Sequence, residues 1–127
     1  MKIDIMTLFP EAVGGMLHSS ILGRAEQKGI LDINCIQIRQ HSDTLHSPTK
    51  LLYEKILDRK FRYEENKLLE INFENARCTY DTNMNRYITK KRSQGKVDMV
   101  VALINAVHLL QQDVFLENDD FFVQVIE

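Results

Sequence analysis

Apolar and polar residues follow two different periods along the chain, and these periods predict a mixture of strands and helices. Residues 2–9 alternate and then become continuously apolar, as in a strand, and Pro10 ends this strand because proline cannot donate to a sheet ladder. Residues 19–29 begin with serines, carry apolar positions at helical spacing and end in glycine, which predicts a short helix after a loose segment at 14–15. Residues 31–38 alternate again. The order strand, helix, strand predicts a right-handed parallel unit.

After residue 39 the spacing of apolar residues is less regular, and it predicts further helices and strands. Residues 44–50 contain Pro48, which disfavours helix in the residue before it, so we expect a loop there and a helix only from about Thr49. The other expected elements are a connector at 61–63, a helix turning into extended chain at 65–75, strands at 76–81 and 86–89 around a turn at 82–85, and a helix at 98–112.

The last apolar stretch, residues 119–126, has two interpretations. It predicts either a late edge strand or an exposed apolar tail through which the chain forms a homo-oligomer. The whole pattern predicts an α/β fold with a small mixed, partly parallel sheet and flanking helices.

Composition narrows the class of protein. The chain has 127 residues, 44% apolar and 27% charged, as expected for one modest globular domain. No stretch approaches the roughly 20 apolar residues of a membrane span, and the N-terminus lacks a signal-peptide pattern, so we expect a cytoplasmic protein without a membrane partner. Cys35 and Cys78 show no metal-ligand spacing and are expected to be reduced.

Charge is distributed unevenly and marks one candidate site. Residues 42–96 carry twelve cations against eight anions, whereas residues 97–127 carry six anions and no Lys or Arg. The basic run ends at Asp98, which opens the most apolar predicted helix. Asp98 has two interpretations: a helix cap, or a ligand of a divalent metal beside a nucleic-acid backbone. The phosphate-binding residues would be the cations of the run, namely Lys90, Lys91, Arg92 and Lys96.

Residues 1–40 resemble the N-terminus of the bacterial tRNA (guanine-N1)-methyltransferase family. The resemblance rests on residues 1–11, 20–25 and 33–39, in that order. It implies a structural starting unit. The glycine-rich segment that follows in that family is missing, because residues 40–127 contain only Gly95. Binding of S-adenosylmethionine is therefore not expected.

Residues 38–112 resemble the C-terminal end of the nuclease domain in the large subunit of tailed-phage terminases. The resemblance rests on Gln40, residues 45–50 and 58–60, the predicted hairpin at 75–89, and the run at 91–106 that contains Lys96-Val97-Asp98. It implies a ribonuclease-H-like remnant. Asp98 matches the family's last metal carboxylate and is thus the candidate catalytic and metal-binding residue, with Mg²⁺ or Mn²⁺ as the cation.

These two resemblances predict a single composite domain over 1–127, with a methyltransferase-like start at 1–40 and a terminase-like remainder at 41–127. One carboxylate is too few for two-metal cleavage, and Asp4 and Glu11 are the further carboxylates we considered. The leading hypothesis is a terminase nuclease fragment with weak DNA or metal binding and little or no cleavage. Its alternatives are a truncated tRNA methyltransferase and a recombined or engineered chimera without activity.

Overall fold

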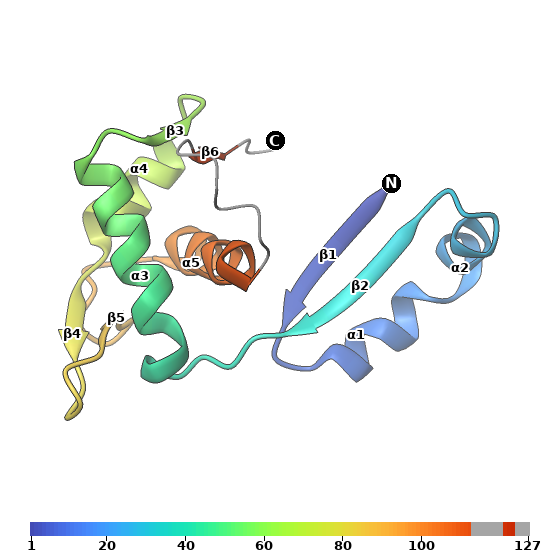
Figure 1. Ribbon diagram of the computed structural model, residues 1–127, viewed down its shortest axis with the longest axis horizontal. Coiled ribbons are helices and arrows are strands. Elements are labelled where there is room, and N and C mark those ends of the chain that lie inside the picture. The colour runs from blue at the N-terminus through green and yellow to red at the C-terminus, as the bar shows by residue number, and fades with distance from the viewer. Residues whose placement is uncertain (113–120, 124–127) are drawn as a thin grey trace. The chain divides into compact units, whose positions relative to one another are not determined.

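The computed structural model describes residues 1–112 and the backbone of residues 121–123 (Figure 1). The chain divides into two compact units, Met1–Gln40 and His41–Glu127. The predicted α/β class is confirmed: helices alternate with short strands, and the described strands pair two by two in three small sheets. Two of these pairs are parallel and one is antiparallel, so the sheet content is mixed. None of the helices in the described part of the chain is long and apolar enough to span a membrane.

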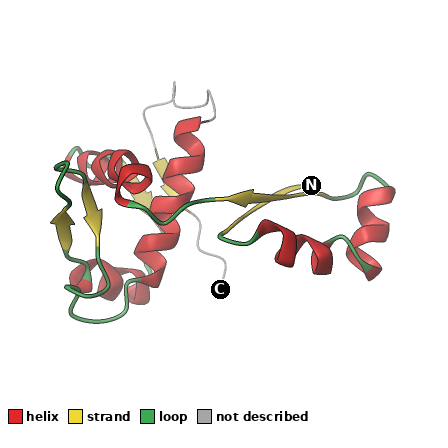
Figure 2. Cartoon of the chain, turned by 90° about the horizontal axis from the view of Figure 1, so that it is seen from below, coloured by secondary structure: helices red, strands yellow, loops and turns green. Residues whose placement is uncertain are grey.

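The first unit contains the predicted strand, helix, strand arrangement. Strands β1 (Lys2–Thr7) and β2 (Asp32–Gln37) pair in parallel over six residues each. Helices α1 (Pro10–Leu17) and α2 (Ser20–Gln27) form the connection between them (Figure 2). Ile33 on β2 is buried, which is the burial that the alternating pattern predicts for one face of a strand.

Helix α1 corrects one expectation, since the segment at 14–15 is helical rather than loose. Pro10 occupies the start of the helix, where its missing N–H would have no partner and its fixed φ favours the helical conformation. Two further backbone bonds hold the segment: the Val13 N–H donates to the Phe9 carbonyl at 3.3 Å, and the His18 N–H donates to the Gly14 carbonyl at 2.9 Å. Strand β1 ends at Thr7, earlier than the end at residue 9 expected from the sequence, and Pro10 begins a helix.

The second unit is built on two packed helices. Its elements are α3 (Ser42–Leu57), β3 (Phe61–Tyr63), α4 (Lys67–Asn75), β4 (Cys78–Tyr80), β5 (Arg86–Ile88), α5 (Asp98–Gln112) and β6 (Phe121–Val123). The core between α3 and α5 consists of Leu45, Leu52, Val100, Ile104 and Val107. The three core residues of α5 are spaced four and three apart, so they form one continuous apolar stripe on the helix.

Helix α3 overturns the loop predicted at 44–50, because it begins at Ser42 and contains Pro48 in its interior. Its buried positions are Leu45, Pro48, Thr49 and Leu52, which follow the i, i+3, i+4, i+7 spacing of a helix face. Pro48 is fully buried in this face. Burial of the whole stripe thus outweighs the backbone hydrogen bond that a proline removes from a helix interior.

The short strands contain one confirmed prediction and one correction. The predicted hairpin is present, because β4 and β5 pair antiparallel. Residues 61–63, expected to be a connector, instead form β3 and pair in parallel with β6. The predicted late strand at 119–126 is therefore present over Phe121–Val123. The remaining residues of that stretch lie outside the part of the chain that the structure describes.

Candidate functional site

The basic run forms a loop between β5 and α5, which we call the basic loop (Lys90–Lys96). Its middle is attached to the hairpin through Ser93. The Ser93 hydroxyl donates to the Thr89 carbonyl at 2.8 Å and accepts from the Arg77 N–H at 3.2 Å. The Arg77 guanidinium also donates to the Gln94 side-chain carbonyl at 3.0 Å. The loop is therefore held to the start of β4 by bonds to both backbone and side chain.

Asn75, the last residue of α4, holds the other side of the basic loop. The Gln94 N–H donates to the Asn75 carbonyl, and the Asn75 side-chain amide donates to the Lys96 carbonyl, both at 3.1 Å. Gly95 lies so close to this amide that a Cβ added to it would come within 2.7 Å of the Asn75 Nδ2. A glycine at this position lets the loop backbone approach α4.

The start of α5 is capped by a residue from another helix. Asn72 on α4 is 3% exposed, and its side-chain oxygen accepts from the Met99 N–H at 3.2 Å. Its amide donates to the Leu68 carbonyl at 2.9 Å, which fixes its orientation. The backbone N–H groups in the first turn of a helix lack partners within the helix, so this contact satisfies one of them.

The sequence reasoning missed Asn72 and Asn75. The signal that could have identified them is their spacing, since residues three apart on a predicted helix lie on the same face.

Asp98 makes an ion pair with the first residue of the basic loop. The Lys90 Nζ lies 2.5 Å from the Asp98 Oδ1, and both side chains are largely exposed, at 69% and 61%. The pKa of Asp98 is lowered, mainly because its carboxylate accepts the hydrogen bond from Lys90 and also because of the charges on Lys90 and Lys96. The acceptor at the start of α5 is thus Asn72, and the Asp98 carboxylate neutralises a lysine instead.

The other three candidate cations remain available to a ligand. Lys91, Arg92 and Lys96 are exposed, and their charged groups make no salt bridge with the residues that the structure describes. The four cations predicted for this site therefore lie on one short loop, with one of them neutralised. The N-terminus of the 15-residue helix α5 follows directly and adds the positive end of its dipole.

The donor set around Asp98 does not fit a two-metal centre. Among residues 1–112, no three His, Cys, Asp or Glu side chains are grouped so that they could hold a metal ion. Asp4 and Glu11, the further carboxylates considered from the sequence, belong to the other compact unit. Mg²⁺ and Mn²⁺ need several oxygen ligands, whereas Asp98 offers one carboxylate that is already paired with Lys90.

Two of the four histidines have structural partners within their own unit. His18 pairs with Glu26 at 2.7 Å in the first unit, and the His46 Nδ1 accepts from the Arg86 N–H at 2.7 Å in the second. The His46 contact joins α3 to the hairpin and thus supports the fold of the second unit.

Comparison with known proteins assigns most of the chain to one family. The model of the endonuclease domain of the terminase large subunit matches residues 19–113. The chain therefore belongs to the terminase large-subunit endonuclease-domain family. No solved structure matches the chain significantly.

Curated relatives match a shorter stretch of the chain. The tRNA (guanine-N(1)-)-methyltransferase of Carboxydothermus hydrogenoformans is 56% identical over 46 residues, which is 36% of this chain and 18% of that protein. The same enzyme from Bacillus pumilus is 50% identical over 46 residues, or 36% of this chain and 19% of that protein. The chain thus spans about a fifth of the length of these relatives. The composite of two resemblances expected from the sequence is confirmed.

Proposed function

We propose that this chain is a nuclease-domain fragment of a phage terminase large subunit that binds DNA weakly through the basic loop and does not cleave it. The observation that supports binding most strongly is the attachment of the loop. Ser93, Asn75 and Gly95 fix its backbone, while Lys91 and Arg92 stay exposed. A fixed loop loses little conformational entropy when its cations contact phosphates.

The expected affinity follows from the number of unpaired cations. Lys90 is neutralised by Asp98, and the other three loop cations make no salt bridge with residues in the described part of the chain. Three phosphate contacts give a slope of log K against log salt of about −2.7, so binding to duplex DNA weakens about 40-fold between 50 and 200 mM salt. The dissociation constant should fall in the range of about 10⁻⁴ to 10⁻⁶ M that is typical of non-specific binding.

Fluorescence anisotropy of a labelled duplex at several salt concentrations tests the proposal. Lys91→Ala and Arg92→Ala should each weaken binding and reduce the salt slope by about 0.9. Lys67→Ala is the matched control, because Lys67 is exposed in the same unit and, like Lys91 and Arg92, makes no salt bridge with the residues that the structure describes. An equal loss of affinity in Lys67→Ala would show that binding depends on total charge and not on the basic loop.

Substitutions of Asp98 distinguish the proposed DNA-binding function from a functional metal site. Asp98→Asn removes a negative charge and releases Lys90, so we expect tighter DNA binding and a salt slope steeper by about 0.9. A metal ligand would behave differently: Mn²⁺-dependent nicking of plasmid DNA would be present in the unaltered protein and lost in Asp98→Ala. We expect no nicking at high protein concentration, and nicking abolished by Asp98→Ala would refute the proposal.

The resemblance to tRNA methyltransferases has its own test. Titration of the chain with S-adenosylmethionine in a calorimeter should give no binding heat. Saturable binding would instead favour the truncated-methyltransferase hypothesis. The two tests are independent, because the first measures DNA binding by the basic loop and the second measures S-adenosylmethionine binding, which would depend on the first unit.

A further inference from the structure

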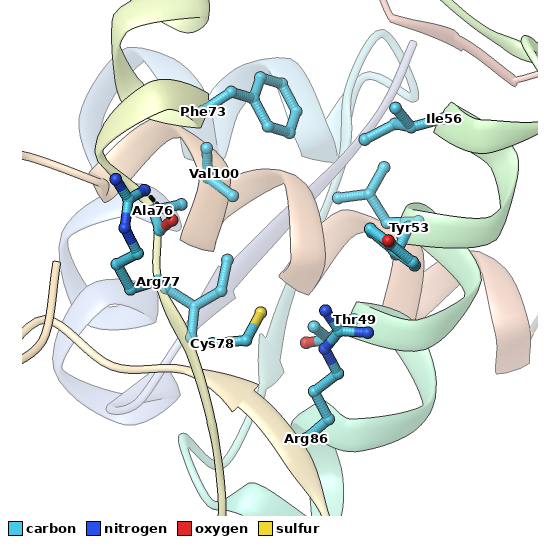
Figure 3. Close-up of a pocket in the computed structure, with 11 residues that line it drawn as sticks. Thr49, Tyr53, Ile56, Phe73, Ala76, Arg77, Cys78, Arg86 and Val100 are labelled. Atoms are coloured by element: carbon cyan, nitrogen blue, oxygen red, sulfur yellow. Dashed lines mark hydrogen bonds between the residues drawn. The ribbon is translucent and has the colours of Figure 1, made fainter.

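A pocket of about 240 Å³ lies in the second unit, between α3, the end of α4, the hairpin and α5 (Figure 3). Its walls are largely apolar, formed by Leu52, Ile56, Phe73, Ile88 and Val100. The volume is below the roughly 300–1,000 Å³ of sites for drug-sized ligands. The pocket is therefore of a size to enclose one small ring or one end of a larger ligand.

Two buried polar atoms at this pocket lack a hydrogen-bond partner among the residues that the structure describes. They are the hydroxyl oxygen of Thr49, which is 5% exposed, and the Nε of Arg86, whose guanidinium also stacks over the Tyr53 ring with its Cζ 4.5 Å from the ring centroid. The hydroxyl can donate or accept, and the Arg86 Nε–H can only donate. Buried polar groups are nearly always paired, so these two atoms indicate a ligand with an acceptor and a second polar group on one edge.

A ligand that suits this pocket is largely apolar and carries polar atoms along one edge. A bare phosphate could accept a hydrogen bond from the Arg86 Nε, but it would leave the apolar walls uncovered. An aliphatic chain would cover the walls but leave the Thr49 hydroxyl and the Arg86 Nε without a hydrogen bond. A nucleobase meets both conditions, since it has an apolar face for the walls and adjacent donor and acceptor atoms along its edge.

The pocket is connected to the basic loop through Arg77. Arg77 lines the pocket, while its backbone N–H contacts Ser93 and its guanidinium contacts Gln94, both of which belong to the loop. A nucleotide offers both chemistries at once: a base for the pocket and a phosphate for the loop cations. Base insertion combined with backbone contacts is a common way to hold single strands.

We propose that this pocket takes one base of single-stranded DNA whose backbone lies on the basic loop. The proposal rests on the proposed function for the backbone contacts, whereas the pocket itself depends only on its walls, Thr49 and Arg86. It predicts that single strands with bases bind more tightly than a sugar-phosphate backbone of the same length and charge.

Cys78 provides a direct report on occupancy of the pocket. It is exposed, lines the pocket, and its sulfur points toward Thr49 and Arg86 in Figure 3. In the variant Cys35→Ser, Cys78 is the only thiol in the chain, because the sequence contains two cysteines. The rate at which N-ethylmaleimide alkylates Cys78 can then be followed by mass spectrometry with and without ligand.

An oligothymidylate of eight nucleotides at saturating concentration should slow the alkylation of Cys78 several-fold. An abasic strand of equal length should leave the alkylation rate unchanged. Thr49→Val keeps the side-chain shape and removes the hydroxyl, so it should reduce the preference for bases over the abasic strand about fivefold. If Thr49→Val fails to fold, the alkylation experiment on the Cys35→Ser variant still decides.

The outcomes separate this proposal from the DNA-binding function. Equal protection of Cys78 by the two strands, or none by either while both bind, would overturn the pocket proposal and leave loop binding intact. Failure of both strands to bind would overturn loop binding, and free thymidine at millimolar concentration then tests the pocket alone. Protection of Cys78 by thymidine supports the pocket, and unchanged alkylation refutes it.

Discussion

Replacing Asn72 with alanine should destabilise the second unit more than any change at Asp98. The substitution removes the acceptor for the Met99 N–H, which as a helix cap contributes about 1 kcal/mol. It also removes the buried bond to the Leu68 carbonyl, for about 1 kcal/mol more. The expected loss in the free energy of unfolding is therefore about 2 kcal/mol.

Tyrosine fluorescence during urea unfolding measures this loss selectively. The chain has no tryptophan, and its four tyrosines all lie in His41–Glu127, so their emission reports on the second unit alone. With an m-value of about 1–3 kcal/mol/M, a loss of about 2 kcal/mol lowers the midpoint by about 1 M urea.

Two variants serve as controls for the Asn72 result. Asn66→Ala removes an ordinary cap, the bond from the Leu69 N–H at 2.9 Å, and should cost about 1 kcal/mol. Asp98→Asn breaks only an exposed ion pair with Lys90 and should move the midpoint less than either alanine variant. A midpoint shift for Asp98→Asn as large as that for Asn72→Ala would refute the assignment of the cap to Asn72.

Three further predictions concern acid stability, a close backbone contact and the core. The pKa of Asp81 is lowered from 3.8 to about 2, chiefly by the hydrogen bond from Ser42, so its contribution to stability is complete above pH 3.8 and is lost as the pH falls toward 2. The difference in urea midpoint between the unaltered protein and Asp81→Asn should therefore shrink over that range. Gly23→Ala should destabilise the first unit, because the added Cβ would come within 2.4 Å of the His18 carbonyl oxygen, even though alanine normally favours helices. Hydrogen exchange should then show reduced protection of the backbone amides in β1 and β2. Ile104→Ala should cost about 3 kcal/mol in the urea assay, since Ile104 is 3% exposed in the core.

The elements that were predicted correctly are those whose pattern is local. Strands β1 and β2, the hairpin of β4 and β5, and the extent of α5 follow from alternation or helical spacing within a few residues, and the parallel pairing of β1 with β2 follows from the order strand, helix, strand. The failures involve distant partners. Pro48 is tolerated in α3 because the stripe around it is buried in the core, and β3 forms because β6 pairs with it from 60 residues further along the chain.

The candidate site also combines features that are local in the sequence with features that depend on distant residues. The cations of the basic loop are visible in the sequence because they are consecutive, or nearly so. Their support is not visible, since Asn75 bonds to Lys96 across 21 positions and Asn72 bonds to Met99 across 27. A single sequence reveals which charges a site contains, whereas the backbone that fixes them depends on contacts between helices.

Asp98 shows how a residue's role depends on its neighbours. A metal site requires several carboxylates around the cation, and a phosphate-binding loop requires that carboxylates be absent or neutralised. In the described chain Asp98 belongs to no group of three side chains that could hold a metal, and its charge is balanced by Lys90, which removes one cation from the loop. Under the proposed function, Asp98 therefore weakens DNA binding by the basic loop. This is why the same substitution, Asp98→Asn, is expected to increase DNA affinity here although it would abolish activity in a complete metal-dependent nuclease.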